Sequence, residues 1–149
     1  MTHSEVATAW AKRQRLIARG HNVHCEDNVI YSYGKHNPIA QFHTARSGQT
    51  IALISSEKGT KSTQNHKGHV MQALCNSFIP FFVVPNTGPT MTAHDHIGNI
   101  EHMLREAQAY LKQAKRAIKH RDRYVSSAAL LRTVAQAYGD AFHCPVHVS

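Results

Sequence analysis

The densest group of side chains that could do chemistry lies in one loop near the middle of the chain. Its members are Lys58, Lys61, Ser62, Thr63, His66 and Lys67. A helix that starts at Ser62 or Thr63 would leave its first backbone N–H groups free, and these groups with the lysines favour a phosphate or another anion. The GxxxxGKS/T spacing of a P-loop is missing. The alternative is that Ser62 or Thr63 only caps the helix.

A second basic group follows one face of a predicted long helix near the carboxyl end. Its members are three, four or seven residues apart: Arg105, Lys112, Arg116, Lys119 and Arg123. If this segment stays helical, they form one face about 27 Å long, which Lys115 and Arg121 extend. Glu101, Glu106 and Asp122 are the opposing charges, so we favour a phosphate-contacting surface over an ordinary solvated face. Such contacts would position a nucleic acid without reading its sequence.

The turn from Tyr31 to His36 combines tyrosine, glycine, lysine and histidine side chains. This combination could stack on a base or polarise a phosphate. If His36 faced His66 across the sheet, the pair could act as acid and base on a nucleotide or phosphoester. The alternative is that the tyrosines belong to the core and His36 to the turn. His36 and His66 are therefore the catalytic candidates, and a non-enzymatic role is favoured.

Thirteen histidines raise the question of a metal site. The local groupings are His21 and His24 beside Cys25, His66 with His69, and His94 with His96. None completes a four-ligand pattern with the usual spacing, and no nucleophile motif such as GxSxG is present. We therefore expect neither a metal ion nor a cofactor.

Composition and charge limit the class of protein. The chain has 149 residues and a formal net charge of +8, which favours one domain with an acidic partner such as nucleic acid. Residues 1–15 lack the apolar segment of a secretory signal. No apolar run approaches the roughly 20 residues of a membrane helix. Three cysteines without CxxC spacing argue against a disulfide framework, so we expect a cytoplasmic protein that does not bind membranes.

Hydrophobic periodicity predicts an amphipathic helix at the amino end, over Ser4–Ala18. Ser4 is the expected cap and Gly20 the expected stop. Trp10 lies on the apolar face with Ile17. We expect Trp10 to dock in the core rather than to stack on a base.

Strand patterns follow in the next part of the chain. Three antiparallel strands are predicted at Val29–Tyr33, Ile39–Thr44 and Gln49–Ser55. Arg46-Ser47-Gly48 is the tight hairpin between the last two. A helix that ends at Asn76 then crosses over to a fully buried fourth strand at Phe78–Val84.

Two helices are predicted after the turn residues Pro85–Pro89, over Thr92–Lys119 and Arg123–Phe142. The first carries the apolar seam of a coiled coil: Ile97, Ile100, Leu104, Ala107, Leu111, Ala114 and Ile118. We favour an antiparallel helical hairpin that covers the sheet. A homodimer through residues 97–118 is the alternative.

The predicted fold class is α+β. It combines a mostly antiparallel four-stranded sheet with an N-terminal helix, a crossover helix and a C-terminal helical hairpin. We predict a single domain over residues 1–149, in which an α/β core at 1–89 carries the hairpin of 90–149 packed on it.

One stretch resembles a group of small uncharacterised proteins of phages and mobile elements. The similarity lies in YSYGKHNPIA at Tyr31–Ala40, which fits YSYGxHxPIA, and in a helix start at Ser62–His66 that fits STxxH. It covers about Val29–Leu74, and Asn37 replaces the aromatic or apolar residue of that group. The resemblance implies an accessory role in a phage or plasmid setting. It also implies one shared polar site: Ser32, Gly34, His36, Ser62, Thr63 and His66.

The favoured function is a non-enzymatic nucleic-acid-binding or phage accessory protein. Its basic helix face and the Lys58–Lys67 loop would contact the phosphates of DNA or RNA. One alternative is a protein-interaction module, such as an inhibitor that docks a nucleic-acid-handling enzyme of the host. The other alternative is a small enzyme that acts through His36 and His66.

Overall fold

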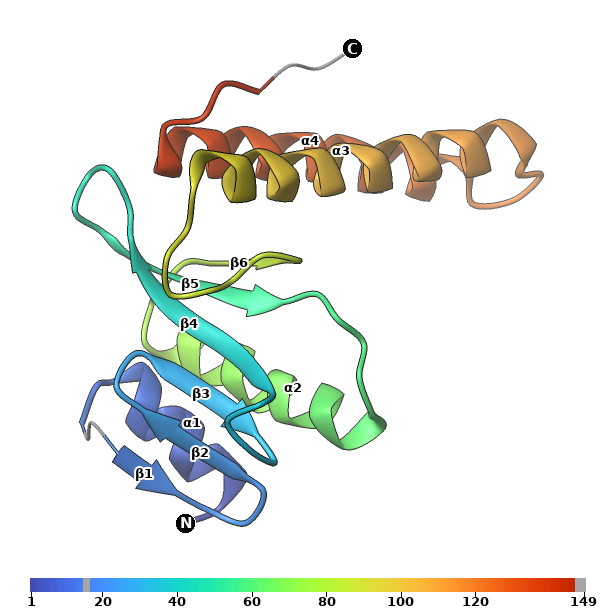
Figure 1. The fold of residues 1–149 in the computed structure, drawn as a ribbon. Coiled ribbons are helices and arrows are strands. Elements are labelled where there is room, and N and C mark those ends of the chain that lie inside the picture. The colour runs from blue at the N-terminus through green and yellow to red at the C-terminus, as the bar shows by residue number, and fades with distance from the viewer. Residues whose placement is uncertain (15–16, 147–149) are drawn as a thin grey trace. The chain divides into compact units, whose positions relative to one another are not determined.

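The computed structural model describes residues 1–14 and 17–146, which group into two compact units. The first unit is Met1–Pro89, and the second begins at Thr90. Within the described residues, the first unit holds a six-stranded sheet with two helices, and the second holds two helices (Figure 1). The α+β class is confirmed, whereas the predicted number of four strands is wrong.

The N-terminal helix α1 (His3–Ala11) is shorter than the predicted Ser4–Ala18, and residues 15–16 of that prediction lie outside the described chain. Thr2 caps α1 in place of Ser4. The Thr2 hydroxyl accepts from the Glu5 N–H, and the Glu5 carboxylate accepts from the Thr2 N–H. The helix ends early because Arg13 has a left-handed backbone, with φ of 54°.

The six strands lie in the order of the chain. They are β1 (Ile17–Arg19), β2 (Val23–Glu26), β3 (Val29–Ser32), β4 (Pro38–Thr44), β5 (Thr50–Ser55) and β6 (Phe81–Val84). The first five form an antiparallel meander, and β6 pairs with β5 in parallel. Helix α2 (Lys61–Asn76) makes the connection that a parallel pair requires. The mostly antiparallel sheet and the crossover helix are confirmed.

The strands β1 and β2 are absent from the sequence prediction for identifiable reasons. Ile17 fits the apolar stripe of the predicted helix, yet it lies on β1 with 55% of its surface exposed. Gly20 follows this strand and does not stop a helix. In β2, Val23 and Cys25 alternate with less buried neighbours, and Glu26 pairs with Val29 across a two-residue turn. That alternation beside Asp27-Asn28 is a strand signal in the sequence.

The core of the first unit lies between the sheet and its two helices. Helices α1 and α2 pack against each other, α1 also contacts β1, β2 and β3, and α2 contacts β4 (Figure 1). Trp10 is 1% exposed and stacks on Phe42 with ring centroids 4.2 Å apart. Its indole N–H donates to the Asn28 carbonyl at 3.1 Å. The core position predicted for Trp10 is therefore confirmed.

The last strand, β6, is shorter and more exposed than the predicted Phe78–Val84. It has a neighbour only on its β5 side in the described sheet, and Val83 is 42% exposed. Phe78 belongs to the exit from α2. It has φ of 55°, its N–H donates to the Cys75 carbonyl, and its side chain is 94% exposed.

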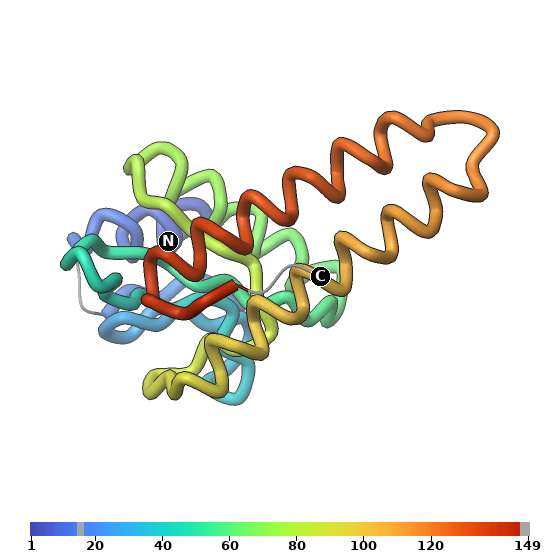
Figure 2. The backbone as a smooth tube through the Cα atoms, turned by 90° about the horizontal axis from the view of Figure 1, so that it is seen from above, coloured from blue at the N-terminus to red at the C-terminus, as the bar shows by residue number. Residues whose placement is uncertain are grey.

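The second unit is a hairpin of two long helices, α3 (Ala93–Arg116) and α4 (Arg121–Phe142), which run antiparallel side by side (Figure 2). Thr92 and Asp95 form a capping box at the start of α3. Helix α3 ends at Arg116 rather than Lys119, and α4 starts at Arg121. No helix in the described residues is long and apolar enough to cross a bilayer.

Small side chains form much of the contact between α3 and α4. The buried alanines are Ala107, Ala114, Ala128 and Ala135, and Ile100 and Met103 are buried beside them. Because the middle of the predicted seam is covered by α4 of the same chain, it is used within the hairpin. Ile97 and Ile118 are the exceptions, since Ile97 is 42% exposed and Ile118 lies in the turn and is 99% exposed.

We expect Tyr138→Phe to destabilise the hairpin by about 1–2 kcal/mol. Tyr138 is fully buried, and its hydroxyl accepts from the Asn99 amide at 2.8 Å and bonds His96 Nδ1 at 2.7 Å. Burial also raises the pKa of Tyr138 well above its usual value, so the hydroxyl stays neutral. Urea unfolding followed by the amide NMR signals of α3 measures the loss.

The matched control for this change is Tyr110→Phe, because the Tyr110 hydroxyl forms no hydrogen bond within the described residues. The control should stay within about 0.5 kcal/mol of the wild-type chain. Equal losses in both variants would mean that the buried hydroxyl of Tyr138 contributes nothing specific.

Candidate functional site

Ser32, Thr63 and His66 meet in the interior of the first unit, and we call them the hydroxyl–histidine cluster. Ser32 Oγ lies 3.1 Å from Thr63 Oγ1 and 2.6 Å from His66 Nδ1. The three residues are 0%, 4% and 3% exposed. Three of the six residues in the polar site that the resemblance implies are thus joined by hydrogen bonds. The buried Ser32 hydroxyl fixes the ring of His66 through this hydrogen bond.

Local structure explains how these residues meet. Ser32 ends β3, and the chain leaves the strand through Tyr33, whose φ is 70° and whose N–H donates to the Asn22 carbonyl. Thr60, rather than Ser62 or Thr63, caps α2. Thr63 and His66 are three residues apart in the helix and therefore lie on one face, which turns toward the sheet.

The other members of the implied polar site lie apart from the cluster. Ser62 and His36 are exposed. A Cβ placed on Gly34 would lie 3.0 Å from the His36 ring, so these two residues pack on each other within the turn. Tyr33 is the turn residue whose ring approaches His66, with centroids 5.6 Å apart.

His66 has a histidine neighbour that the sequence did not indicate. The rings of His3 and His66 pack edge to face with centroids 4.4 Å apart, and His3 lies 6.1 Å from His69. His3 Nε2 also bonds the His21 carbonyl at 2.5 Å. His3 stands at the first position of α1, and no local pattern links it to α2, which is why sequence analysis missed it.

The three histidines line a pocket of about 580 Å³, which we call the histidine pocket. It is lined by His3, Ser62, Gln64, Asn65, His66, Gly68, His69 and Gln72. The lining holds imidazoles, amides and a hydroxyl, and it holds no carboxylate or lysine. Such a surface offers hydrogen-bond donors and acceptors, and its charge is set by the histidines.

The lysines of the predicted helix-start site divide into two kinds. Lys67 is 4% exposed, and its ammonium donates to the Glu57 carbonyl. Burial lowers the pKa of Lys67, which Glu57 partly opposes. This burial removes Lys67 from the predicted phosphate contacts. Lys58 and Lys61 are exposed beside the cap of α2 and stay candidates.

The basic residues of the second unit gather at the turn of the hairpin, and we call them the basic tip. They are Lys112, Lys115, Arg116, Lys119, Arg121 and Arg123, all exposed. The predicted single helical face is wrong, because α3 ends at Arg116 and Arg123 belongs to α4. Arg105 is exposed on α3 outside the tip and shares a face with Lys112 and Arg116.

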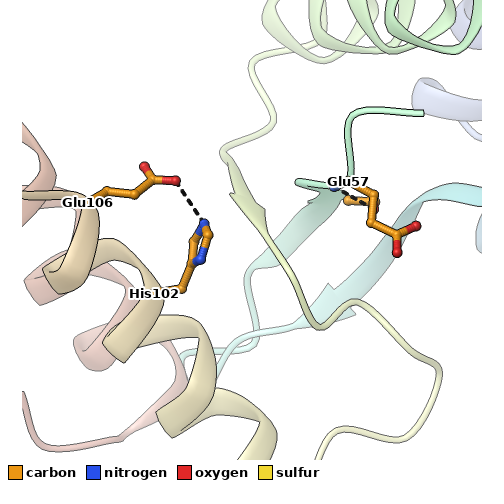
Figure 3. Close-up of polar contacts among 4 residues, drawn as sticks. Glu57, His102 and Glu106 are labelled. Atoms are coloured by element: carbon orange, nitrogen blue, oxygen red, sulfur yellow. Dashed lines mark hydrogen bonds and ion pairs between the residues drawn. The ribbon is translucent and has the colours of Figure 1, made fainter. Parts of the chain in front are cut away.

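Few carboxylates compensate the basic tip. Asp122 is the acidic residue within 112–123. Glu106, a predicted counter-charge, instead pairs with His102 at 2.8 Å on the same helix (Figure 3). Arg121 is engaged with the end of α3, where its guanidinium donates to the Ala114 and Ala117 carbonyls. Five cations of the tip therefore face solvent without an ion pair in the described structure.

We expect acid to destabilise the first unit. Burial lowers the pKa of His66, and the neighbouring His3 and His69 lower it further. Burial also lowers the pKa of His43. A histidine with a lowered folded-state pKa binds fewer protons when folded, so its contribution is complete above about pH 6.5 and is lost as pH falls toward the folded pKa.

Urea unfolding followed by Trp10 fluorescence checks this pH dependence, because Trp10 is the single tryptophan and lies in the first unit. The midpoint should be lower at about pH 5.5 than at about pH 7.5. A His66→Gln variant should show a flatter profile. A wild-type midpoint that is the same at both pH values would contradict the expectation.

The comparisons with known proteins leave the site to be interpreted from its own geometry. No family model, no curated protein and no solved structure matches this chain.

Proposed function

We propose that this protein binds nucleic acid through the basic tip of its helical hairpin. The observation that carries the proposal is the group of solvent-facing cations at 112–123, which have almost no carboxylate among them. Cations held on a rigid element suit the regularly spaced phosphates of a nucleic acid.

Helix stability alone does not account for this charge. Lys115 and Arg116 lie in the last turn of α3, where the helix dipole favours cations. Arg123, however, lies in the first turn of α4, where the same dipole disfavours them. An anionic partner explains better why a cation stands at this unfavourable helix end, four residues after Lys119.

The turn adds an apolar side chain to this surface. Ile118 is 99% exposed between Arg116 and Lys119. In the proposed complex, it contacts sugars or base edges while the flanking cations hold phosphates. The phosphate contacts are independent of sequence, so we propose general rather than sequence-specific binding.

Fluorescence polarisation of the full chain with labelled single- and double-stranded DNA and RNA tests the proposal. We expect the logarithm of the affinity to fall linearly with the logarithm of salt concentration. The slope on duplex DNA should lie between about −3 and −5, since each phosphate contact contributes about −0.9. Affinity that is absent at about 0.1 M salt with all four ligands would refute the proposed function.

A further inference from the structure

The histidine pocket of the first unit is a site that nucleic-acid binding by the tip does not use. It lies between the start of α1 and the exposed side of the first half of α2. His66 lines it although only 3% of this residue is exposed. One ring nitrogen of His66 bonds Ser32, and the other forms no hydrogen bond within the described residues. A buried histidine with one uncommitted nitrogen at a pocket is the feature that points to a ligand.

The hydroxyl–histidine cluster determines what His66 presents to that ligand. Thr60 Oγ1 donates to Thr63 Oγ1 at 3.2 Å. If Thr63 donates in turn to Ser32, and Ser32 to His66 Nδ1, each hydroxyl donates one hydrogen bond. In the opposite direction, Thr63 would accept two bonds and its own hydrogen would have no partner in the cluster. The first arrangement places the proton of neutral His66 on Nε2, so an N–H donor faces the pocket.

The residues around His66 carry no negative charge, so the pocket attracts an anion once the pocket has bound protons. His3 approaches from α1, Tyr33 from the turn after β3 and His69 from α2. None of them is a carboxylate, and the pocket lining contains none. Each proton bound here therefore adds positive charge that the protein does not neutralise. Burial holds the pKa of His66 down, and repulsion from the neighbouring imidazoles lowers it further. An anion in the pocket would relieve that repulsion.

We propose that the histidine pocket binds a phosphate group, with the Nε2–H of His66 as a donor to it and with proton uptake in the pocket as it binds. A phosphate dianion supplies several acceptor oxygens, which suits imidazolium groups and the amides of Asn65 and Gln72. A metal ion would need a lone pair on His66 Nε2, whereas the hydroxyl chain leaves a proton there. The ligand is thus an acceptor-rich anion rather than a cation.

Isothermal titration calorimetry of the full chain tests the proposal with inorganic phosphate and with sulfate, which stays a dianion over the relevant pH range. Both titrations use a Lys112→Ala, Arg116→Ala, Lys119→Ala background, which removes three cations of the tip. We expect sulfate to bind about tenfold more tightly per pH unit of acidification for each proton taken up. Failure here would leave the proposed nucleic-acid function intact, because that function is measured on the tip.

Two variants locate the ligand. His66→Gln should weaken sulfate binding roughly 10- to 100-fold by removing a charge-assisted hydrogen bond, and His36→Gln, on an exposed residue outside the pocket, should leave it unchanged. If His66→Gln fails to fold, NMR of the wild-type histidine rings decides. Sulfate should shift the ring signals of His66 and leave those of His36 in place. Equal binding by both variants, no binding, or tight Zn²⁺ binding that is lost in His66→Gln would overturn the proposal.

Discussion

Replacing Lys112, Arg116 and Lys119 by alanine is expected to weaken nucleic-acid binding roughly 100- to 500-fold at about 0.1 M salt. The binding affinity contributed by one phosphate contact varies with salt concentration to the power of about −0.9, so one contact raises the affinity up to about eightfold at about 0.1 M salt. The factors from three such contacts multiply. All three side chains are exposed and none belongs to an ion pair in the described structure. Alanine is compatible with a helix surface, so the hairpin should fold as before.

The control removes the same charge from the first unit. Lys12, Arg19 and Lys35 are exposed, comprise two lysines and an arginine like the tip variant, and lie outside the proposed surface. The replacement of Lys35 removes only a surface ion pair with Glu26. We expect at most a few-fold loss of affinity from this control in the same polarisation assay. Equal losses in the two triple variants would mean that net charge, and not the tip, governs binding.

Replacing Trp10 by alanine is expected to cost the first unit about 3–5 kcal/mol. The side chain is 1% exposed, stacks on Phe42 and donates its indole N–H to the Asn28 carbonyl. The change therefore leaves a large cavity and removes a hydrogen bond. Because domains are typically stable by only about 5–15 kcal/mol, the first unit should become marginal. Urea unfolding followed by amide NMR signals of β4 reports this unit without relying on tryptophan fluorescence.

Phe78→Ala is the matched control for Trp10→Ala, since it also truncates an aromatic side chain to alanine. Phe78 is 94% exposed and has φ of 55° in the exit from α2. We expect a change within about 0.5 kcal/mol. A cost below about 1 kcal/mol for Trp10→Ala would show that Trp10 does not anchor the core.

The elements with strong periodicity could be predicted from the sequence. The alternation in β3 and β4 and the apolar, β-branched residues of β5 indicate strands, and Gly48 marks the tight hairpin, where its φ is 88°. The short strands could not be placed in the same way. Ile17–Arg19 has too few residues to show a period, and its apolar side chains fit the preceding helix equally well.

The break between α3 and α4 illustrates a second limit. Ile118 continues the apolar spacing of α3, so periodicity extends the predicted helix to Lys119. In the structure, Ala117 takes an extended backbone and His120 a left-handed one. The carbonyls released at the end of α3 are bonded by Arg121. This interaction depends on tertiary geometry and leaves no signature in the local sequence.

The hydroxyl–histidine cluster shows what a motif can and cannot indicate. The resemblance groups Ser32, Thr63 and His66 in one polar site, but it gives no measure of the distance between β3 and α2. Folding brings them together because Thr63 and His66 lie on the buried face of α2. His3 joins them only because α1 packs beside α2, a long-range contact that spacing along the chain cannot show.

The most direct test of the central claim, that the basic tip itself contacts phosphates, is the difference in salt slope between two proteins. The wild-type chain and the Lys112, Arg116, Lys119 variant would be titrated with the same DNA duplex over one salt series. Three lost phosphate contacts should make the slope of the variant shallower by about 2.7. Parallel lines with equal slopes would contradict the claim and assign the phosphate contacts to another part of the chain.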